Sequence, residues 1–391
     1  MHSESFLIDL ILILSATKFL GLVTKSIHMP QVVGALIAGL VLGPACLGYV
    51  EETTFLENIS ELGVIILMFA AGLETDVSKL KESGKHSFII AFLGALVPLI
   101  GGFAVACAFN SPTTEELFLQ NLFIGIILTA TSVSITVETL KELGKLSTNS
   151  GNAILGAALI DDILGIMGLT IVTSLAGSDI SVSVVLLKII CFFILSGLLG
   201  LVTRQLFVDW VSKYEEDLQR FVIVSFIICL IYSYVAEHIF GVASITGAFI
   251  AGLLVTNTGH THYIEARFST LSYMLLSPVF FASIGLKVTL PEMTPTIISF
   301  TITLIVVAIL TKIIGCMIAG KICKYTPRES FQIGTGMVSR GEVALIMTTQ
   351  GTPLGLINPD FFAPIVIMVI ATTVLSPILL KVAFSDKQYK K

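Results

Sequence analysis

The sequence predicts an all-α polytopic membrane protein with about thirteen transmembrane helices. Of its 391 residues, 55% are hydrophobic and 13% are charged, and the mean hydropathy is +0.96. A soluble globular chain carries about 25% charged residues, so roughly half of the usual surface charge is missing. Apolar stretches of about 20 residues, each long enough to cross a bilayer as a helix, recur from end to end. A large soluble all-helical core is the disfavoured alternative.

Short polar loops separate these stretches, and several stretches contain Gly or Pro, which membrane helices tolerate where neighbours satisfy the backbone. The predicted helices run near residues 5–26, 29–44, 57–74, 85–109, 115–141, 151–177, 181–207, 218–239, 242–257, 264–286, 295–320, 328–352 and 360–384. The first stretch has no basic segment before it and no cleavage site after it, which indicates a membrane helix and not a signal peptide. Residues 1–391 are expected to form one transmembrane unit without a soluble regulatory domain.

The positions of Lys and Arg predict how the chain is oriented in the membrane. Alternate loops carry the basic residues, namely Lys25, Lys79, Lys81, Lys85, Lys141, Lys145, Arg204, Lys213, Arg220, Arg267, Lys321, Lys324 and Arg328. The intervening loops are acidic, with Glu51, Glu52, Glu115, Glu116, Asp179, Glu237 and Asp360, and contain Lys287 as their single base. We therefore expect a plasma membrane protein with its N-terminus outside and its C-terminus in the cytoplasm.

An internal repeat is visible at an offset of 213 residues. Gly34-Ala-Leu-Ile-Ala-Gly-Leu40 matches Gly247-Ala-Phe-Ile-Ala-Gly-Leu253, and Phe69-Ala-Ala-Gly-Leu73 matches Phe281-Ala-Ser-Ile-Gly-Leu286 with one residue inserted. The matched helices run in opposite directions on the predicted topology. We therefore expect two inverted repeats, at 1–177 and 218–391, joined by a linker helix at 178–217. Inverted repeats are typical of alternating-access secondary transporters.

Few ionisable residues lie deep within the predicted helices: Lys18, Glu138, Asp161, Asp162, Lys188, Lys312, Arg340 and Glu342. A charge in the hydrocarbon costs several kcal/mol, so each is a functional candidate. Lys18 and Lys188 are expected to be structural, because long basic side chains can reach the interface or a subunit surface. Glu138 is expected at a wetted, charged helix end. The six cysteines occur singly and are expected to be ordinary core residues.

Asp161 and Asp162 lie about ten residues from the start and about fifteen from the end of their predicted helix at 151–177, near the bilayer midplane. Adjacent helical residues project about 100° apart, so the two carboxylates face different neighbours. Both cannot stay ionised at low dielectric without a cation, and Lys312 is the natural partner. The other carboxylate can then take a proton or a hard cation such as Na⁺, Li⁺ or K⁺. The competing interpretation is a structural ion pair beside a satisfied second acid.

Two segments are predicted to interrupt helices at equivalent places in the two halves. Thr129-Ala-Thr-Ser-Val-Ser134 is rich in hydroxyl and β-branched residues, which favour leaving a helix and supply oxygen atoms. Adding 213 to Ala130 gives Val343, next to Ser339-Arg-Gly-Glu342. Paired interruptions of this kind indicate a binding site in repeat-built transporters. Arg340 and Glu342 could neutralise exposed half-helix ends, or could simply lie near a cytoplasmic helix end.

With these residues, the chain resembles the monovalent cation:proton antiporter-2 family, and within it the bacterial NapA- and GerN-type Na⁺/H⁺ antiporters. The resemblance covers essentially the whole chain. It rests on Met29-Pro-Gln-Val-Val-Gly34, Phe69-Ala-Ala-Gly-Leu-Glu74, Thr129-Ala-Thr-Ser132, Ile160-Asp-Asp162, Phe280-Phe281 with Gly285-Leu286, Lys312, and Ser339-Arg-Gly-Glu342. The Asp pair and the Arg-Gly-Glu run carry most of the weight.

The resemblance implies an NhaA-like fold and a homodimer, in which each protomer has a dimerisation domain and a six-helix core with crossed, discontinuous helices. It implies that Asp162 is the main ligand for the cation and the proton, and that Asp161 pairs with Lys312. Thr129, Ala130, Thr131 and Ser132 would line the unwound site, and Arg340, Glu342 and Glu74 would form a charge network in the core. The Asp-Asp pair with the lysine implies electrogenic exchange by an elevator-like motion.

Antiport of Na⁺ or Li⁺ against protons is therefore the predicted function, and pH homeostasis is the process that it is expected to serve. K⁺/H⁺ exchange on the same architecture is the main alternative. An intramembrane aspartyl protease is disfavoured, because its two aspartates come from different helices and its Gly-x-Gly-Asp pattern is absent. An ungated channel is disfavoured too. The expected partners are the bilayer, monovalent cations, protons and a second copy of the chain, with no cofactor and no nucleic acid.

Overall fold

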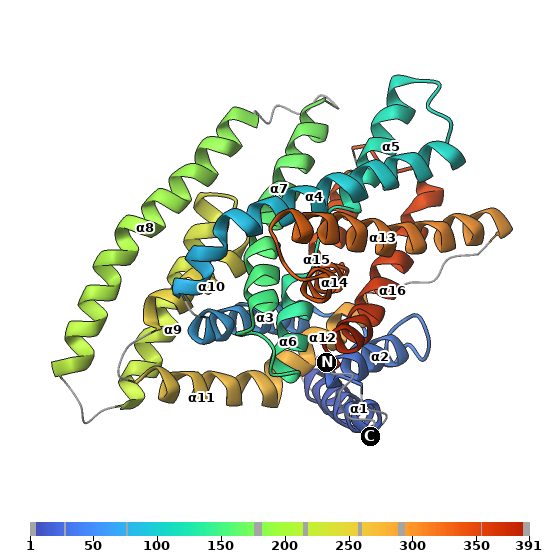
Figure 1. Ribbon diagram of the computed structural model, residues 1–391. Helices are drawn as coiled ribbons and strands as arrows, with labels where there is room; N and C mark the ends of the chain where they lie inside the picture. Colours follow the sequence, from blue (N-terminus) through green and yellow to red (C-terminus); the bar gives the residue numbers. More distant parts are fainter. Residues whose placement is uncertain are drawn as a thin grey trace, which may run out of the picture.

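The computed structural model describes residues 5–26, 29–75, 77–175, 182–213, 218–256, 260–287, 294–352 and 354–385, and these residues are all-helical, with no strand (Figure 1). The first half contains α1 (Ser5–Ser26), α2 (Gln31–Leu42), α3 (Thr54–Glu74), α4 (Val77–Phe109), α5 (Glu115–Ile127), α6 (Val133–Glu142), α7 (Asn149–Leu175) and α8 (Val182–Lys213). The second contains α9 (Leu218–Tyr234), α10 (Ser244–Val255), α11 (Thr261–Leu271), α12 (Ser277–Leu286), α13 (Pro295–Ile322), α14 (Pro327–Gly336), α15 (Glu342–Gly351) and α16 (Pro359–Phe384). π-helical turns at Val235–Ile239 and Ser272–Leu276 follow α9 and α11.

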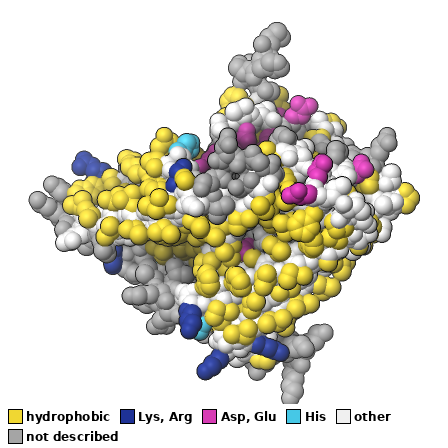
Figure 2. Space-filling view, turned by 90° about the horizontal axis from the view of Figure 1, so that it is seen from above, with side chains coloured by type: hydrophobic (Ala, Val, Ile, Leu, Met, Phe, Trp, Pro, Cys, Tyr) yellow, Lys and Arg dark blue, Asp and Glu magenta, His cyan; other side chains and the backbone are white. Residues whose placement is uncertain are grey.

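Within the described residues, nine continuous helical stretches are long and apolar enough to cross a membrane, and α2 and α10 are shorter apolar helices. Their outer faces carry large apolar side chains, such as Phe19, which is 66% exposed, and Leu198, which is 62% exposed. Figure 2 shows hydrophobic side chains spread over much of one face. Contiguous apolar surface of this extent is incompatible with water and fits a bilayer. The predicted polytopic membrane class is confirmed.

Several helices extend past the boundaries predicted from hydropathy. The helix predicted at 85–109 begins at Val77, and the one predicted at 181–207 continues to Lys213. Both extensions contain charged residues, so they lie beyond the apolar part of the helix. Hydropathy reports where a helix meets lipid, whereas backbone hydrogen bonding continues into the polar interface.

Local sequence signals explain where many of the helices start. Thr326 begins α14 with a capping box, in which its hydroxyl accepts from the Glu329 amide and the Glu329 carboxylate accepts from the Thr326 amide. Thr53, Thr114 and Thr294 cap α3, α5 and α13 through single hydroxyl contacts. Each cap satisfies a backbone amide that the first helical turn leaves without a partner.

Two helices are broken in the middle, at the places that the sequence predicted. The chain leaves helical geometry between α5 and α6, at residues 128–132, and again between α14 and α15, at residues 337–341. The two breaks are joined directly: the Ser132 amide donates to the Ser339 carbonyl at 2.8 Å, and the Ser339 hydroxyl donates to the Ser132 carbonyl at 3.0 Å. The four half-helices therefore meet at one junction, called the crossing below. The long helices α4 and α13 lie side by side next to it (Figure 1).

Glycines bring α2 into backbone contact with α12. A Cβ atom on Gly39 would overlap the carbonyl of Ala282, and one on Gly285 would overlap the amide of Leu40. Only glycine lets two helix backbones approach this closely.

The same contact recurs between α10 and α3. A Cβ atom on Gly252 would overlap the carbonyl of Phe69, and one on Gly72 would overlap the carbonyl of Phe249. Gly252 and Gly285 lie 213 residues after Gly39 and Gly72. The two matched sequence motifs therefore make equivalent contacts, each between a helix of one half and a helix of the other.

Candidate ion-binding site

Helix α7 carries the two neighbouring aspartates into the protein interior. Asp161 is 1% exposed and Asp162 is 3% exposed. Between its ends at Asn149 and Leu175, α7 is unbroken and apolar around the pair. It therefore holds both carboxylates at a fixed depth, where water cannot solvate them freely and a partner cation or a proton is required.

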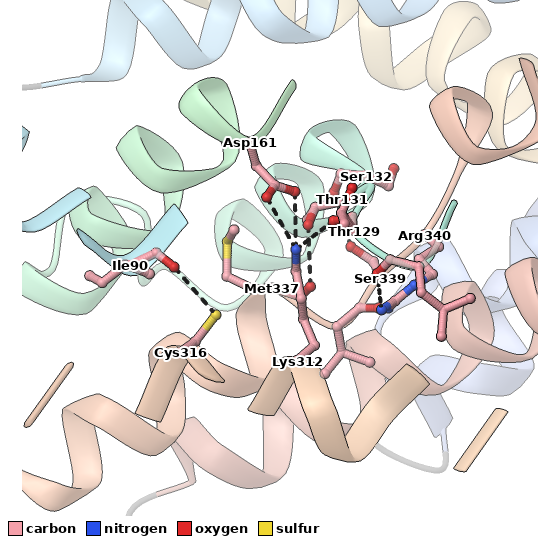
Figure 3. A network of polar contacts seen from close by, with 12 residues as sticks. Ile90, Thr129, Thr131, Ser132, Asp161, Lys312, Cys316, Met337, Ser339 and Arg340 are labelled. Carbon is pink, nitrogen blue, oxygen red and sulfur yellow. Dashed lines mark hydrogen bonds and ion pairs between the residues drawn. The ribbon is translucent and has the colours of Figure 1, made fainter. Parts of the chain in front are cut away.

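Lys312 of α13 reaches Asp161 and the broken segment at once. Its ammonium is fully buried and lies 3.1 Å from Asp161 Oδ2 and 3.2 Å from Oδ1. It also donates to the Thr129 carbonyl at 2.6 Å, just past the end of α5 (Figure 3). Partial negative charge gathers at the C-terminal end of a helix, so the ammonium stabilises both the carboxylate and the end of this half-helix. The expected contact between Lys312 and Asp161 is present; its role in transport stays a prediction.

Arg340 is the second fully buried cation at the crossing, and its bonds go to backbone carbonyls. It donates to Val338 at 2.7 Å, to Leu128 at 2.6 Å and to Ala308 at 3.1 Å. Leu128 and Val338 belong to the two breaks, whereas Ala308 lies on α13. Its 0% exposure places Arg340 in the protein interior, which disfavours the alternative that it simply lies near a cytoplasmic helix end. Neutralisation of the α5 end, which was expected of Arg340, is what its geometry provides.

Hydroxyl groups bind further carbonyls in the second break and at the end of α14 that precedes it. Thr136 donates to the Gly336 carbonyl at 2.8 Å and lies 2.8 Å from the Ser339 hydroxyl. Thr131 approaches the Met337 carbonyl at 3.5 Å, and Thr373 of α16 donates to the Arg340 carbonyl. Unwound backbone inside a membrane protein is tolerated only where such partners exist. Specific side chains therefore bind the backbone carbonyls that the break in the helix leaves without helical partners.

The residues predicted to line the site, from Thr129 to Ser132, lie together in the first break and are all at most 5% exposed. Thr129 donates its own hydroxyl to the Ile126 carbonyl at 2.7 Å. The Ser132 hydroxyl lies 3.3 Å from the Ser134 hydroxyl. Carbonyl and hydroxyl oxygens are thus concentrated next to Asp161, which is the donor chemistry that hard monovalent cations prefer.

Two members of the predicted charge network of Arg340, Glu342 and Glu74 lie apart among the described residues, namely Arg340 and Glu74. Glu74, at the end of α3, lies 2.8 Å from Lys141 of α6, and among the described contacts it makes none with Arg340. The reason is position: Arg340 is inside the crossing, whereas Glu74 meets the far end of α6. The Glu342 backbone starts α15, but its side chain lies outside the part of the chain that the structure describes.

Sequence reasoning missed Thr136 and Thr373, which bind the second break. Thr136 follows the hydroxyl-rich segment closely and could have been included with it. Thr373 carried no signal, because a threonine in a membrane helix commonly bonds back to its own helix, as its neighbour Thr372 does with the Met368 carbonyl at 2.9 Å.

The fold and the site together define a class of protein: an α-helical membrane protein with two joined broken helices and a buried carboxylate–ammonium pair beside them. A family profile described as sodium/hydrogen exchanger, transmembrane, matches residues 10–384. The chain belongs to this family.

The similar proteins cover nearly the whole chain. The Na⁺/H⁺-K⁺ antiporter GerN of Bacillus cereus is 38% identical, over 98% of this chain and 97% of its own length. A Na⁺/H⁺ antiporter of Enterococcus hirae is also 38% identical, over 97% and 98%. Two structures of the sodium–proton antiporter MjNhaP1 from Methanocaldococcus jannaschii superpose with TM-scores of 0.68 and 0.73 at 18% and 19% identity, covering 95% and 100% of this chain and 94% and 100% of theirs. At that identity, the structural match supports the fold.

Proposed function

We propose that this protein exchanges Na⁺ or Li⁺ for protons across the bacterial plasma membrane. The observation that carries the proposal is the fully buried contact of Lys312 with Asp161 and the Thr129 carbonyl. A purely structural ion pair in hydrocarbon is expensive, and this one lies beside a second buried carboxylate and an unwound backbone. Relatives named as Na⁺/H⁺ antiporters support the same chemistry.

Coupling follows from competition at Asp162. Its carboxylate binds a cation or a proton, and an ion-free, deprotonated site would place uncompensated charge at the membrane barrier. Such a site does not cross, so each crossing carries one species or the other. Lys312 adds a second exchange: when its ammonium leaves Asp161, that carboxylate can take a proton, and the Thr129 carbonyl becomes a free oxygen ligand. The proton on Asp161 adds to the one exchanged at Asp162. More than one proton is then exchanged for each Na⁺, so the exchange is electrogenic.

The fold supports thirteen membrane crossings. The nine long stretches and the two short apolar helices give eleven, and the α5–α6 and α14–α15 pairs supply one each. The equivalent glycine contacts of α2 with α12 and α10 with α3 support the inverted repeats at 1–177 and 218–391, with 178–217 as the linker. In this scheme α4 to α7 and α13 to α16 form the six-helix NhaA-like core, and the remaining repeat helices form the domain through which two copies associate.

A cavity supports access from the acidic side of the membrane. Its volume is about 680 Å³, and its walls come from α3, α10, α15 and α16, together with Lys287. Four acidic side chains lie along it: Glu52, Glu57, Glu61 and Glu237. Acidic walls raise the local concentration of cations. Orientation by the positive-inside rule makes this the outer mouth.

On the opposite, basic side of the membrane, α6 is bound to α2 and α3. Lys141, on α6 of the core, pairs with Glu74 of α3, and the neighbouring Glu142 accepts from the Gln31 amide at the start of α2 at 2.7 Å. Elevator-like motion of the core against α2 and α3 breaks both contacts. These contacts support a conformation that is closed toward the cytoplasm.

The decisive variant is Asp162→Asn, measured as Na⁺-dependent ΔpH in proteoliposomes. We expect proton movement to disappear, because the amide can neither ionise nor release a proton. Asp360→Asn, at the exposed start of α16, is the control and should transport normally. Substantial Na⁺-dependent proton movement by Asp162→Asn would refute the scheme.

K⁺/H⁺ exchange is the second candidate, because GerN is named for K⁺ as well as Na⁺. Oxygen ligands do not separate these cations by type alone. Pairwise competition of Na⁺, Li⁺ and K⁺ in the same proteoliposomes decides it: a stronger inhibition of Na⁺ flux by K⁺ than by Li⁺ would favour the K⁺ function.

A further inference from the structure

A large apolar crevice separates α8 from the core. It measures about 670 Å³ and lies between α8 and the helices α4, α7 and α10. Small residues of α8, namely Ser196, Gly197 and Gly200, face it. A Cβ atom added to Gly197 would meet nothing within 4 Å, so the space beside this glycine is open. In Figure 1, α8 runs along one edge of the molecule.

The walls of the crevice show what kind of molecule could fill it. Half of the lining residues are Leu, Ile or Phe, and most of the others are Gly or Ser. Phe193, one of them, is 40% exposed, so the crevice opens to the outer surface. Close-packed interiors do not leave spaces of this size empty. Water finds few polar partners on such walls, and the surrounding solvent here is lipid. An acyl chain is the occupant that matches these walls.

The polar groups of the crevice add a preference for charge. Arg204 lines it and is exposed, and no ion pair of Arg204 occurs among the described residues. Ser87, which also lines it, is 1% exposed, and its hydroxyl has no hydrogen-bond partner among the described residues. Arg204 belongs to the basic, cytoplasmic side of the predicted topology, where basic pockets between membrane helices bind anionic headgroups. A guanidinium suits the phosphodiester of such a headgroup, and the Ser87 hydroxyl is a second polar group on the same walls.

We propose that this crevice is a binding site for an anionic phospholipid, with one acyl chain between α8 and α7 and the phosphate at Arg204. The site lies against the ion-binding helix, because Ile160 of α7 lines the crevice and directly precedes Asp161. An acyl chain bound there lies between α8, the linker helix, and α7, a helix of the core. Lipid binding can therefore change how easily the core moves, without any contact with the transported ion.

The test is a lipid titration of the full-length protein by native mass spectrometry, with phosphatidylglycerol, phosphatidylcholine and glycerol phosphate as separate probes. Arg204→Gln removes the charge, and Gly197→Phe fills the open space with a side chain. Lys188→Gln is the matched control, because Lys188 is an exposed cation on the same helix that does not line the crevice. Thermal unfolding of each variant in detergent confirms that it is folded.

We expect Arg204→Gln to weaken phosphatidylglycerol binding about fivefold, since one basic residue contributes about 1 kcal/mol to anionic lipid binding. Gly197→Phe should weaken binding of both phospholipids, and Lys188→Gln should change neither. The proposal fails if Arg204→Gln binds phosphatidylglycerol as well as the unaltered protein does. It also fails if phosphatidylcholine binds equally well, or if glycerol phosphate displaces the lipid, because the site would then not select an anionic phospholipid.

Discussion

Two fully buried cations lie at the same crossing and have different partners. Lys312 divides its bonds between a carboxylate and a carbonyl, whereas Arg340 donates to three carbonyls. A carboxylate can gain a proton and release its partner, but a carbonyl cannot. Arg340 is therefore a fixed part of the crossing, while the Lys312 region can exist in two states. The chemistry of the partner, more than burial, separates a structural charge from an exchangeable one.

The largest effect is expected from Lys312→Gln. The change leaves Asp161 buried without its cation, which costs roughly 3 to 5 kcal/mol when one partner of a buried pair is removed. The double variant Asp161→Asn with Lys312→Gln removes both charges, so we expect it to recover thermal stability and to exchange Na⁺ for protons without net charge. Lys188→Gln serves as the control.

Thermal unfolding measures whether the double variant recovers stability, and solid-supported-membrane currents measure whether its exchange carries net charge. A double variant that still produces the full current of the unaltered protein would mean that Lys312 does not determine whether the exchange carries charge.

Arg340→Lys should have the next largest effect, and it should act on stability. A lysine keeps the charge but has one compact donor group in place of the planar fork, so it cannot hold Val338, Leu128 and Ala308 together. Each carbonyl left buried without a donor costs about 1 to 3 kcal/mol. We expect a clear drop in the unfolding temperature, with the apparent Na⁺ affinity of the folded fraction unchanged. The exposed Arg267→Lys is the control; a change of Na⁺ affinity without loss of stability would place Arg340 in the ion site.

Thr136→Val tests the hydroxyl contacts of the second break. It removes the bonds to the Gly336 carbonyl and the Ser339 hydroxyl, and we expect a loss of about 1 to 3 kcal/mol. Thr139→Val is a matched control on the same helix, because its hydroxyl bonds only within the helix, to the Ile135 carbonyl. Equal unfolding temperatures for the two variants would show that the bonds of Thr136 to Gly336 and Ser339 add nothing to stability.

The smallest effect on stability is expected at the pair of Glu74 and Lys141, whose side chains are 24% and 16% exposed. Partly exposed ion pairs contribute about 0 to 1 kcal/mol, so Glu74→Gln should unfold almost as the unaltered protein does. Its turnover should change, because the pair joins α3 to α6 across the proposed moving interface. Exchanging the two residues should restore the original turnover. A normal turnover in Glu74→Gln would remove this contact from the transport cycle.

The sequence predicted the arrangement around Asp161 well for a physical reason. Charges in the hydrocarbon are rare, so the few that occur must find one another, and Lys312 lies in the middle of a predicted helix in the second half of the chain. The two breaks were predictable because the first segment is rich in hydroxyl residues and the second, at Ser339-Arg-Gly-Glu342, lies near the position that the 213-residue offset gives. The apolar stretches located the helices because their length is fixed by the bilayer thickness.

Other features of the structure could not be predicted from the sequence. The pairing of Glu74 with Lys141 depends on how the end of α6 meets α3, which residue types do not encode. The bonds from Arg340 go to backbone atoms, which are the same at every position, so the sequence cannot show which carbonyls it selects. The crevice beside α8 is a property of packing between helices far apart in the chain, and its only sequence trace is a group of small residues.

Competition between Na⁺ and protons at Asp162 is tested most directly by measuring the apparent Na⁺ affinity of transport against pH in proteoliposomes. A cation that binds only the deprotonated carboxylate must displace protons. Below the pKa of the site, the apparent affinity should therefore fall about tenfold per pH unit for each proton displaced, while the maximal rate at saturating Na⁺ stays constant. An apparent Na⁺ affinity that does not change with pH, while the maximal rate does, would contradict the account.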